Sequence, residues 1–166
     1  MILKYKDIAK KLESKYFFHS SINSENTFSK IMADIKPVPT SIVEIGTYFG
    51  ISTAILASIC KVYTFDVRYF PEVDYVWSAL GVKENIRSYI VENSDWTKIV
   101  LKDIPFDFAI IDSVHDEDNA RKDFDIVKKC GRVLFHDNND RFPGVQKFCK
   151  EIGCKKIKEF GYWEAI

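Results

Sequence analysis

The stretch Ser41-Ile-Val-Glu-Ile-Gly-Thr-Tyr-Phe-Gly-Ile-Ser-Thr-Ala-Ile-Leu-Ala57 decides the fold. Its apolar run Ile42–Ile45 predicts a buried β-strand that breaks at Gly46, and a helical apolar pattern begins after Ser52. A strand, a glycine turn and a helix N-terminus in this order bring backbone N–H groups close to a nucleotide-like ligand. The glycines of the turn allow a sharp change of direction and leave no Cβ in the way of that ligand.

A carboxylate follows at the distance that a doubly wound fold requires. Asp66 lies in the strand-like run Val62–Val67, twenty residues after Gly46, where such folds place an acid on a ribose hydroxyl. The turn lacks the middle glycine of the dinucleotide fingerprint, because Tyr48 occupies that place. Together with Glu44 inside the strand, this favours a ligand with an amino group and a ribose, such as S-adenosylmethionine, over a pyrophosphate. The alternative is an ordinary strand-to-helix turn of an α/β protein.

The rest of the chain alternates strands with helices, which predicts an α/β fold with a parallel sheet and right-handed crossovers. The 166 residues suffice for one domain, in which residues 1–36 form an N-terminal helical cap and residues 37–166 the core. The expected helices of the cap are Tyr5–Phe18 and Asn26–Ile35, and the expected strands are Ile42–Ile45, Val62–Val67, Ser88–Val91, Phe108–Asp112, Arg132–His136, Lys155–Phe160 and Tyr162–Ile166. Only Gly161 separates the last two strands, which is too short for a standard two-residue hairpin turn.

Four motifs resemble those of one family. Val43–Thr53 is similar to the cofactor motif of small-molecule class I methyltransferases, and the likeness continues in order through Phe106–His115, Gly131–Asp137 and Pro143–Phe148. The group resembled is that of short bacterial O-methyltransferases of the methyltransferase domain 24 type, related to sugar and catechol-type O-methyltransferases. The resemblance extends from about Ile35 to the C-terminus. It implies a Rossmann-like, doubly wound, mostly parallel sheet of six or seven strands, with an antiparallel C-terminal strand inserted between its neighbours.

The resemblance also implies that S-adenosyl-L-methionine binds at the carboxyl ends of the strands, where ligands bind in open α/β sheets. The residues expected to hold this cofactor are Glu44, Gly46, Thr47, Tyr48, Gly50, Ser52, Asp66, Asn93, Ser94 and Asp112. Glu44 and Gly46 are expected near the methionine part, and Asp66 on the ribose hydroxyls. Asn93 and Ser94 are expected near the adenine, with an ordinary polar turn as the alternative.

Asp112, Asp137 and Asn138 match in type and order the three Mg²⁺ ligands of the catechol-type enzymes, so the resemblance implies a metal site. A hard cation prefers such oxygen ligands. It would hold a substrate hydroxyl, lower the pKa of that hydroxyl and direct it at the sulfonium methyl group. His136 is an alternative ligand, since related sugar enzymes carry adjacent acidic residues at this place. The alternative to a metal is that Asp112 and Asp137 cap helix N-termini.

His115 stands three residues after Asp112, at an offset where the catechol-type enzymes hold a catalytic lysine and the shorter family a histidine. An imidazole titrates near neutral pH and suits the work of a general base on a hydroxyl. We therefore expect His115 and Asp112 to be the catalytic residues. The alternative is that His115 is a surface residue, because Asp116, Glu117 and Asp118 follow it in a charged loop.

Composition limits the partners. Lys+Arg and Asp+Glu both number 24, so there is no net positive charge to attract a nucleic acid. No segment approaches the ~18 uninterrupted apolar residues of a membrane span, and the first residues lack the apolar centre of a signal peptide. The four cysteines form no C-x-x-C pair and indicate reduced thiols in a cytoplasmic protein.

The sequence thus predicts a Mg²⁺-assisted, S-adenosylmethionine-dependent O-methyltransferase that acts on a hydroxyl of a small molecule such as a sugar or a secondary metabolite. One alternative is a cofactor-binding but catalytically idle module that serves as a subunit or regulatory partner. A second is a nucleotide-cofactor oxidoreductase, against which Glu44 and the absent glycine argue. Methyl transfer needs alignment and exclusion of water, so a lid is expected from Tyr16–Phe18, from a Tyr69–Trp77 loop or from a second copy of the chain in a homodimer.

Overall fold

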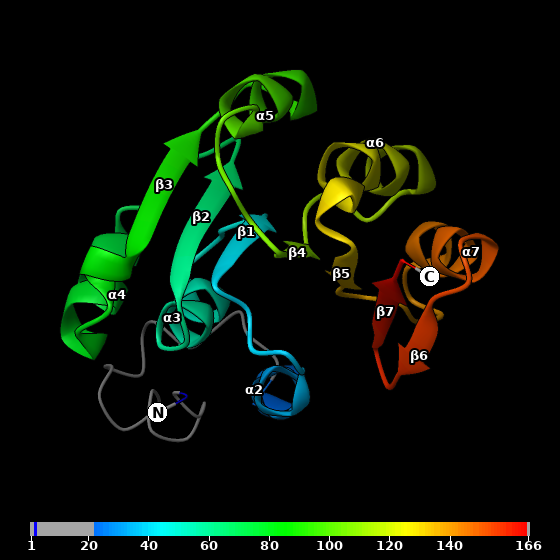
Figure 1. Ribbon diagram of the computed structural model, residues 1–166, viewed down its shortest axis with the longest axis horizontal. Coiled ribbons are helices and arrows are strands. Elements are labelled where there is room, and N and C mark those ends of the chain that lie inside the picture. Colours follow the sequence, from blue (N-terminus) through cyan, green and yellow to red (C-terminus); the bar gives the residue numbers. More distant parts are fainter. Residues whose placement is uncertain (1, 3–21, 166) are drawn as a thin grey trace.

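A computed structural model of the chain describes residue 2 and residues 22–165 (Figure 1). The predicted helix Tyr5–Phe18 and the lid candidate Tyr16–Phe18 lie outside these residues. Seven strands of the described part form one sheet in the order β3-β2-β1-β4-β5-β7-β6. In chain order they are β1 (Ser41–Ile45), β2 (Lys61–Asp66), β3 (Ile86–Ile90), β4 (Phe108–Ile111), β5 (Arg132–Phe135), β6 (Lys155–Ile157) and β7 (Phe160–Glu164).

The strand directions confirm the predicted topology. β1 to β5 run parallel, whereas β7 lies between β5 and β6 and is antiparallel to both. From β1 the chain proceeds outward to β2 and β3, and it then returns to the other side of β1 with β4. Such a reversal of strand order opens a crevice at the carboxyl ends of the strands, which is where open α/β sheets bind ligands.

Helices cover both faces of the sheet. They are α2 (Ile22–Asp34), α3 (Ile51–Ala57), α4 (Glu72–Leu80), α5 (Ser94–Leu101), α6 (Glu117–Val127) and α7 (Pro143–Glu151), with short 3-10 turns η2 (Lys83–Asn85) and η3 (Lys128–Cys130). Figure 1 shows α2, α3 and α4 on one side of the sheet and α5, α6 and α7 on the other. Neighbouring residues of β1 serve the two cores in turn: Ile42 packs with the first helix layer and Val43 with the second, as the two-residue period of a strand requires.

Three sequence-based boundaries were wrong. The helix predicted at Asn26–Ile35 begins at Ile22 and ends at Asp34. Only the first three residues of the predicted Tyr69–Trp77 loop lie outside a helix, because α4 begins at Glu72 directly after Pro71, a residue that favours the start of a helix. The ends of the five parallel strands agree with the predicted ends to within two residues.

The third error concerns the C-terminal hairpin. Its turn is Lys158–Glu159, with Lys158 in the left-handed region at φ 55°, and Gly161 lies inside β7. A Cβ atom on Gly161 would lie 2.8 Å from the Sγ of Cys149 and 2.9 Å from the Nδ2 of Asn138. The glycine therefore permits close packing of β7 and does not form the turn. Among the described residues, no helix is both long and apolar enough to cross a membrane.

Candidate cofactor cavity and metal centre

A cavity of about 740 Å³ opens at the carboxyl ends of the parallel strands. Of the predicted cofactor residues, six line it and four do not. Those that line it are Gly46, Tyr48, Asp66, Asn93, Ser94 and Asp112, and those that do not are Glu44, Thr47, Gly50 and Ser52. His115, His136 and Asp137 also line the cavity, whereas Asn138 does not. One cavity therefore joins the glycine loop after β1 to the histidines and acids after β4 and β5.

The glycine loop passes directly against the end of β4. Gly46 has a φ of 103°, and a Cβ atom there would overlap the backbone carbonyl of Asp112. Gly50, with a φ of 74°, packs against α4 instead: its carbonyl accepts a 2.9 Å hydrogen bond from the indole Nε1 of Trp77. Gly46 thus allows the close approach of two strand ends, and Gly50 anchors the start of α3.

Asp66 holds this loop in place. Its Oδ2 accepts hydrogen bonds of 2.9 Å from the backbone N–H groups of both Thr47 and Tyr48, and its Oδ1 accepts one of 3.0 Å from the N–H of Arg68. A carboxylate has about four acceptor positions, and Asp66 lines the cavity. It can therefore accept a hydroxyl of a bound ligand while it fixes the backbone of the loop.

Glu44 lies behind the loop and not in the cavity. The side chain is fully buried, and its two oxygens accept hydrogen bonds from the hydroxyls of Ser52 (2.7 Å), Thr53 (2.5 Å) and Thr64 (2.7 Å). Burial raises the pKa of Glu44 to about 7, against the opposing effect of these hydrogen bonds. The hydroxyl of Thr47 joins the network through Thr64 at 2.6 Å. Glu44 and Ser52 therefore stabilise the loop and do not line the cavity.

Asp123 was not predicted from the sequence as a site residue. Its side chain connects two segments that line the cavity, at Ser94 and at Ser113. Its side chain is buried on α6, and its carboxylate accepts hydrogen bonds from the hydroxyls of Ser94, at 2.7 Å, and Ser113. Burial raises its pKa. The signal was an acid at a core position, since Ala120, Phe124 and Val127 bury the same face of the helix. The partners of Asp123, which are Ser94 and Ser113, depend on tertiary packing and could not be predicted from the sequence.

Asn93 has a local role as well. It is the N-cap of α5, and its side-chain oxygen accepts hydrogen bonds from the backbone N–H groups of Asp95 and Trp96. Both Asn93 and Ser94 line the cavity. The predicted polar turn and the predicted ligand contact are thus compatible, because one turn provides the cap and the cavity wall.

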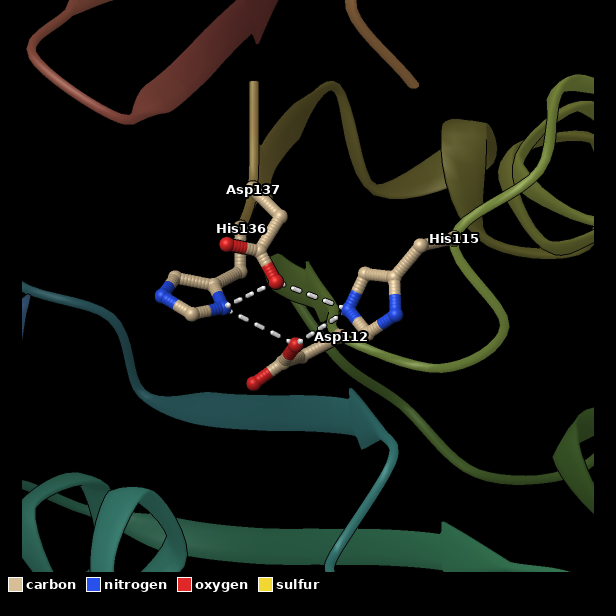
Figure 2. A group of neighbouring side chains, drawn as sticks. All are labelled: Asp112, His115, His136 and Asp137. Carbon is tan, nitrogen blue, oxygen red and sulfur yellow. Dashed lines mark hydrogen bonds and ion pairs between the residues drawn. The ribbon is translucent and has the colours of Figure 1, made fainter. Parts of the chain in front are cut away.

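Asp112, His115, His136 and Asp137 converge at the other end of the cavity (Figure 2). One ligand atom from each residue lies within 4.8 Å of the other three. Asp112 Oδ1 lies 3.0 Å from His136 Nδ1 and 3.4 Å from His115 Nε2. Asp137 Oδ2 lies 2.9 Å from His115 Nε2 and 3.3 Å from His136 Nδ1. We call these four residues the His-Asp cluster.

Asn138 does not join the His-Asp cluster. Asp137 is in the left-handed region at φ 57°, and the chain then pairs with the C-terminal hairpin. The backbone N–H of Asn138 donates to the carbonyl of Glu159 at 2.7 Å, and its side-chain amide donates to the carbonyl of Phe160 at 3.4 Å. The residue is 4% exposed. The structure therefore brings together two of the three predicted metal ligands and adds two imidazoles to them.

The carboxylates of the cluster keep the imidazoles protonated when no cation is bound. Hydrogen bonds to Asp112 and Asp137 raise the pKa of His115 to about 9. Burial acts to lower the pKa of His136, but hydrogen bonds to the same carboxylates outweigh burial and raise it to about 10. Burial opposes the charged forms of Asp112 and Asp137, yet their pKa values are held below the ordinary range by the two histidines.

Two alternatives for these residues were wrong. Asp112 and Asp137 do not cap helices, because the N-cap of α6 is Asp116, and α7 follows Phe142. His115 is not a free surface residue, since its side chain contacts both carboxylates and its ring packs on that of Phe142 at a centroid distance of 4.3 Å.

The sequence of residues 43–138, more than half of the chain, matches a family described as a methyltransferase domain. The chain belongs to this methyltransferase domain family. The match includes the glycine loop, Asp66 and the whole His-Asp cluster, so the family assignment covers both ends of the cavity. No curated protein matches the chain.

Solved structures show the same fold for this methyltransferase domain. An O-methyltransferase from Bacillus cereus in complex with SAH (S-adenosylhomocysteine) has a TM-score of 0.72 and 16% identity, over 99% of this chain and 93% of that one. TomG, an O-methyltransferase of tomaymycin synthesis from Streptomyces achromogenes in complex with SAM, has a TM-score of 0.67 and 16% identity, over 92% and 80%. MycE from the mycinamycin biosynthetic pathway, in complex with Mg and SAH, has a TM-score of 0.70 and 14% identity, over 99% and 54%.

Proposed function

We propose that this methyltransferase domain transfers a methyl group from S-adenosylmethionine to a hydroxyl group of a small molecule. The observation that carries the proposal is the single cavity, which has the glycine loop at one end and the His-Asp cluster at the other. A volume of about 740 Å³ lies in the range of small-molecule sites. The SAM or SAH bound to TomG and to the Bacillus cereus enzyme supports the choice of cofactor.

In this proposal the carboxylate of Asp66 accepts the ribose hydroxyls, and the turn at Asn93 and Ser94 contacts the adenine. The methionine part lies beside Gly46, where no Cβ obstructs it. Glu44 makes no contact with the cofactor and instead keeps the loop in shape through Ser52 and Thr64. Each group thus binds or supports the cofactor, and none of them acts as a nucleophile.

The His-Asp cluster would hold a divalent cation, whose chemistry is to bind a substrate hydroxyl and lower its pKa. The donors present are two carboxylates and two imidazoles, where the sequence predicted two carboxylates and an amide, with His136 as an alternative ligand. When the cluster holds a cation, His115 and His136 are neutral ligands, because a metal replaces the protons on the donor atoms. Deprotonation of the substrate then does not require His115 as a base.

A sugar or a secondary metabolite is the substrate class that we propose. The rim of the cavity combines aromatic rings with polar groups, since Tyr48 packs on Phe70 at a centroid distance of 5.1 Å and Arg68 lies over the same Phe70 ring at 4.9 Å. TomG and MycE, which have the same fold, belong to the tomaymycin and mycinamycin pathways. Organic rings that carry hydroxyl groups fit such a rim.

Two measurements test the proposal. Calorimetric titration should show that SAH binds and that NAD does not. A screen of hydroxylated sugars and phenols with methyl-labelled S-adenosylmethionine should show label on oxygen in at least one compound. Binding of NAD in place of SAH would contradict the cofactor, whereas tight binding of SAH with no methyl transfer to any compound would indicate the idle module.

A further inference from the structure

The His-Asp cluster has a donor set that differs from that of a magnesium site, because two of its four donors are imidazole nitrogens. Its four close contacts alternate between acid and imidazole, so Asp112, His136, Asp137 and His115 form a closed ring with sides of 3.0, 3.3, 2.9 and 3.4 Å. Figure 2 shows the four side chains pointing toward one common centre. Each carboxylate uses one oxygen in the ring.

The sides of this ring match the spacing of ligand atoms around a small dication. Two ligand atoms at about 2.1 Å from an ion lie about 3.0 Å apart at a right angle and about 3.4 Å apart at the tetrahedral angle. The four sides fall within or very near that interval. An ion could therefore enter the ring with small movements of the side chains.

The chemistry of the donors selects the kind of ion. Imidazole nitrogen suits zinc, iron, nickel and related ions, while magnesium prefers carboxylates, carbonyls and several retained waters. The amide that would complete an oxygen-only set, that of Asn138, is buried against Phe160 and does not reach the cavity. Two carboxylates also balance the charge of a dication when both imidazoles are neutral.

Neighbouring groups hold the four donors in place. Backbone bonds fix the strand ends, since the N–H of Asp112 donates to the carbonyl of Ile45 at 2.8 Å and that of His136 to the carbonyl of Ile111 at 3.0 Å. The ring of His115 packs on Phe142, and that of His136 lies 5.0 Å from the ring of Phe160. Such support of the ligands is typical of metal sites in proteins.

We propose that Asp112, His115, His136 and Asp137 bind a first-row transition-metal dication, such as Mn²⁺, Fe²⁺, Co²⁺ or Zn²⁺, in preference to Mg²⁺. The ring opens onto the cavity, so the ion keeps positions for an oxygen of the substrate. The use of the ion in methyl transfer rests on the proposed function. The preference of the His-Asp cluster for transition metals rests on its donor atoms alone. His115 is then a metal ligand and not the general base.

The decisive experiment measures metal binding without cofactor or substrate. Protein freed of metal by chelation is titrated with ZnCl₂, CoCl₂, MnCl₂ and MgCl₂ alone. We expect one ion per chain and an affinity for Co²⁺ and Zn²⁺ on the order of a hundredfold above that for Mg²⁺. Pulsed electron paramagnetic resonance of Mn²⁺ bound to the unaltered protein should show coupling to imidazole nitrogen.

Variants identify the ligands. His136→Ala and His115→Ala should each weaken Co²⁺ binding by about a hundredfold or more, since loss of a group that merely supports a ligand already costs about tenfold to a hundredfold. Glu92→Gln, which changes a cavity-lining carboxylate outside the ring, should leave Co²⁺ binding unchanged. Equal affinities for Mg²⁺ and Co²⁺, an absence of nitrogen coupling or an absence of any bound ion would each overturn the proposal. Titration of the unaltered protein with SAH tests the proposed function separately. If the unaltered protein does not bind SAH, the proposed function is contradicted, whether or not a metal ion binds.

Discussion

The Cα of Gly46 lies so close to the backbone carbonyl of Asp112 that a Cβ atom on Gly46 would overlap the carbonyl oxygen. This contact joins the cofactor loop after β1 to the strand end that carries the first residue of the His-Asp cluster. The backbone N–H of Asp112 also donates to the carbonyl of Ile45, one residue before the glycine. The two halves of the cavity therefore share a boundary that tolerates no side chain.

Gly46→Ala should weaken SAH binding by about a hundredfold or more, because the methyl group must push the loop away from Asp112 and the glycine φ of 103° is unfavourable for alanine. Calorimetric titration measures the loss. Gly81→Ala is the matched control, since Gly81 also has a positive φ of 69°, but a Cβ atom added there would have no neighbouring atom within 4 Å. Equal SAH affinity in the two variants would contradict the proposed position of the cofactor beside Gly46.

Asp66→Ala should lower the affinity for SAH by roughly 2 kcal/mol or more, about thirtyfold, since hydrogen bonds to a charged group contribute about 1.5–3 kcal/mol each. The variant removes the acceptor for the N–H groups of Thr47 and Tyr48 as well as the proposed acceptor for the ribose. Asp103→Ala, at an exposed position, should bind SAH like the parent. Undiminished binding by Asp66→Ala at the same temperature and salt concentration would remove Asp66 from the site.

Much of the fold was predictable, because its signals are local. The apolar run at Ile42–Ile45 and the glycines after it specify a strand, a turn and a helix. Parallel strands then bring their carboxyl ends to one edge, which places Asp66, Asp112 and Asp137 around a common cavity. The inserted antiparallel strand followed from family resemblance and not from periodicity.

The orientation of Asn138 was not predictable from the same signals. It depends on the left-handed conformation of Asp137 and on the close approach of β7, which Gly161 permits. Both are tertiary features, and neither has a pattern of its own in the sequence. The partners of Asp123 were hidden for a similar reason, because they lie 29 and 10 residues away along the chain.

Asp123→Ala should lower the free energy of unfolding by about 2–4 kcal/mol, since it leaves the hydroxyls of Ser94 and Ser113 without their buried acceptor. SAH binding should weaken too, because the turn at Ser94 lines the cavity. Urea denaturation and calorimetry measure the two effects. Asp125→Ala on the same helix removes only an exposed ion pair with Lys128 and should change stability by about 0.5 kcal/mol or less. A similar loss in the two variants would show that the Asp123 contacts contribute little.

Glu44→Gln should change how stability depends on pH. Burial raises the pKa of Glu44 to about 7 in the folded chain from an ordinary 4.5, so the folded state holds this proton more tightly than the unfolded state does. The free energy of unfolding contributed by Glu44 is therefore greatest at pH 4.5 and below, falls as the pH rises toward 7, and is level above that.

The difference between the parent and Glu44→Gln should follow that window. Between pH 4.5 and pH 8 the variant should gain roughly 3 kcal/mol of stability relative to the parent, because each pKa unit corresponds to about 1.4 kcal/mol and glutamine does not titrate. Urea denaturation at half-unit steps of pH measures both curves. For Glu84→Gln, at an exposed position, the curve of unfolding free energy against pH should be parallel to that of the parent over the whole range. If the Glu44→Gln curve is also parallel to the parent, Glu44 is ionised at neutral pH, and its three hydroxyl donors outweigh the effect of burial.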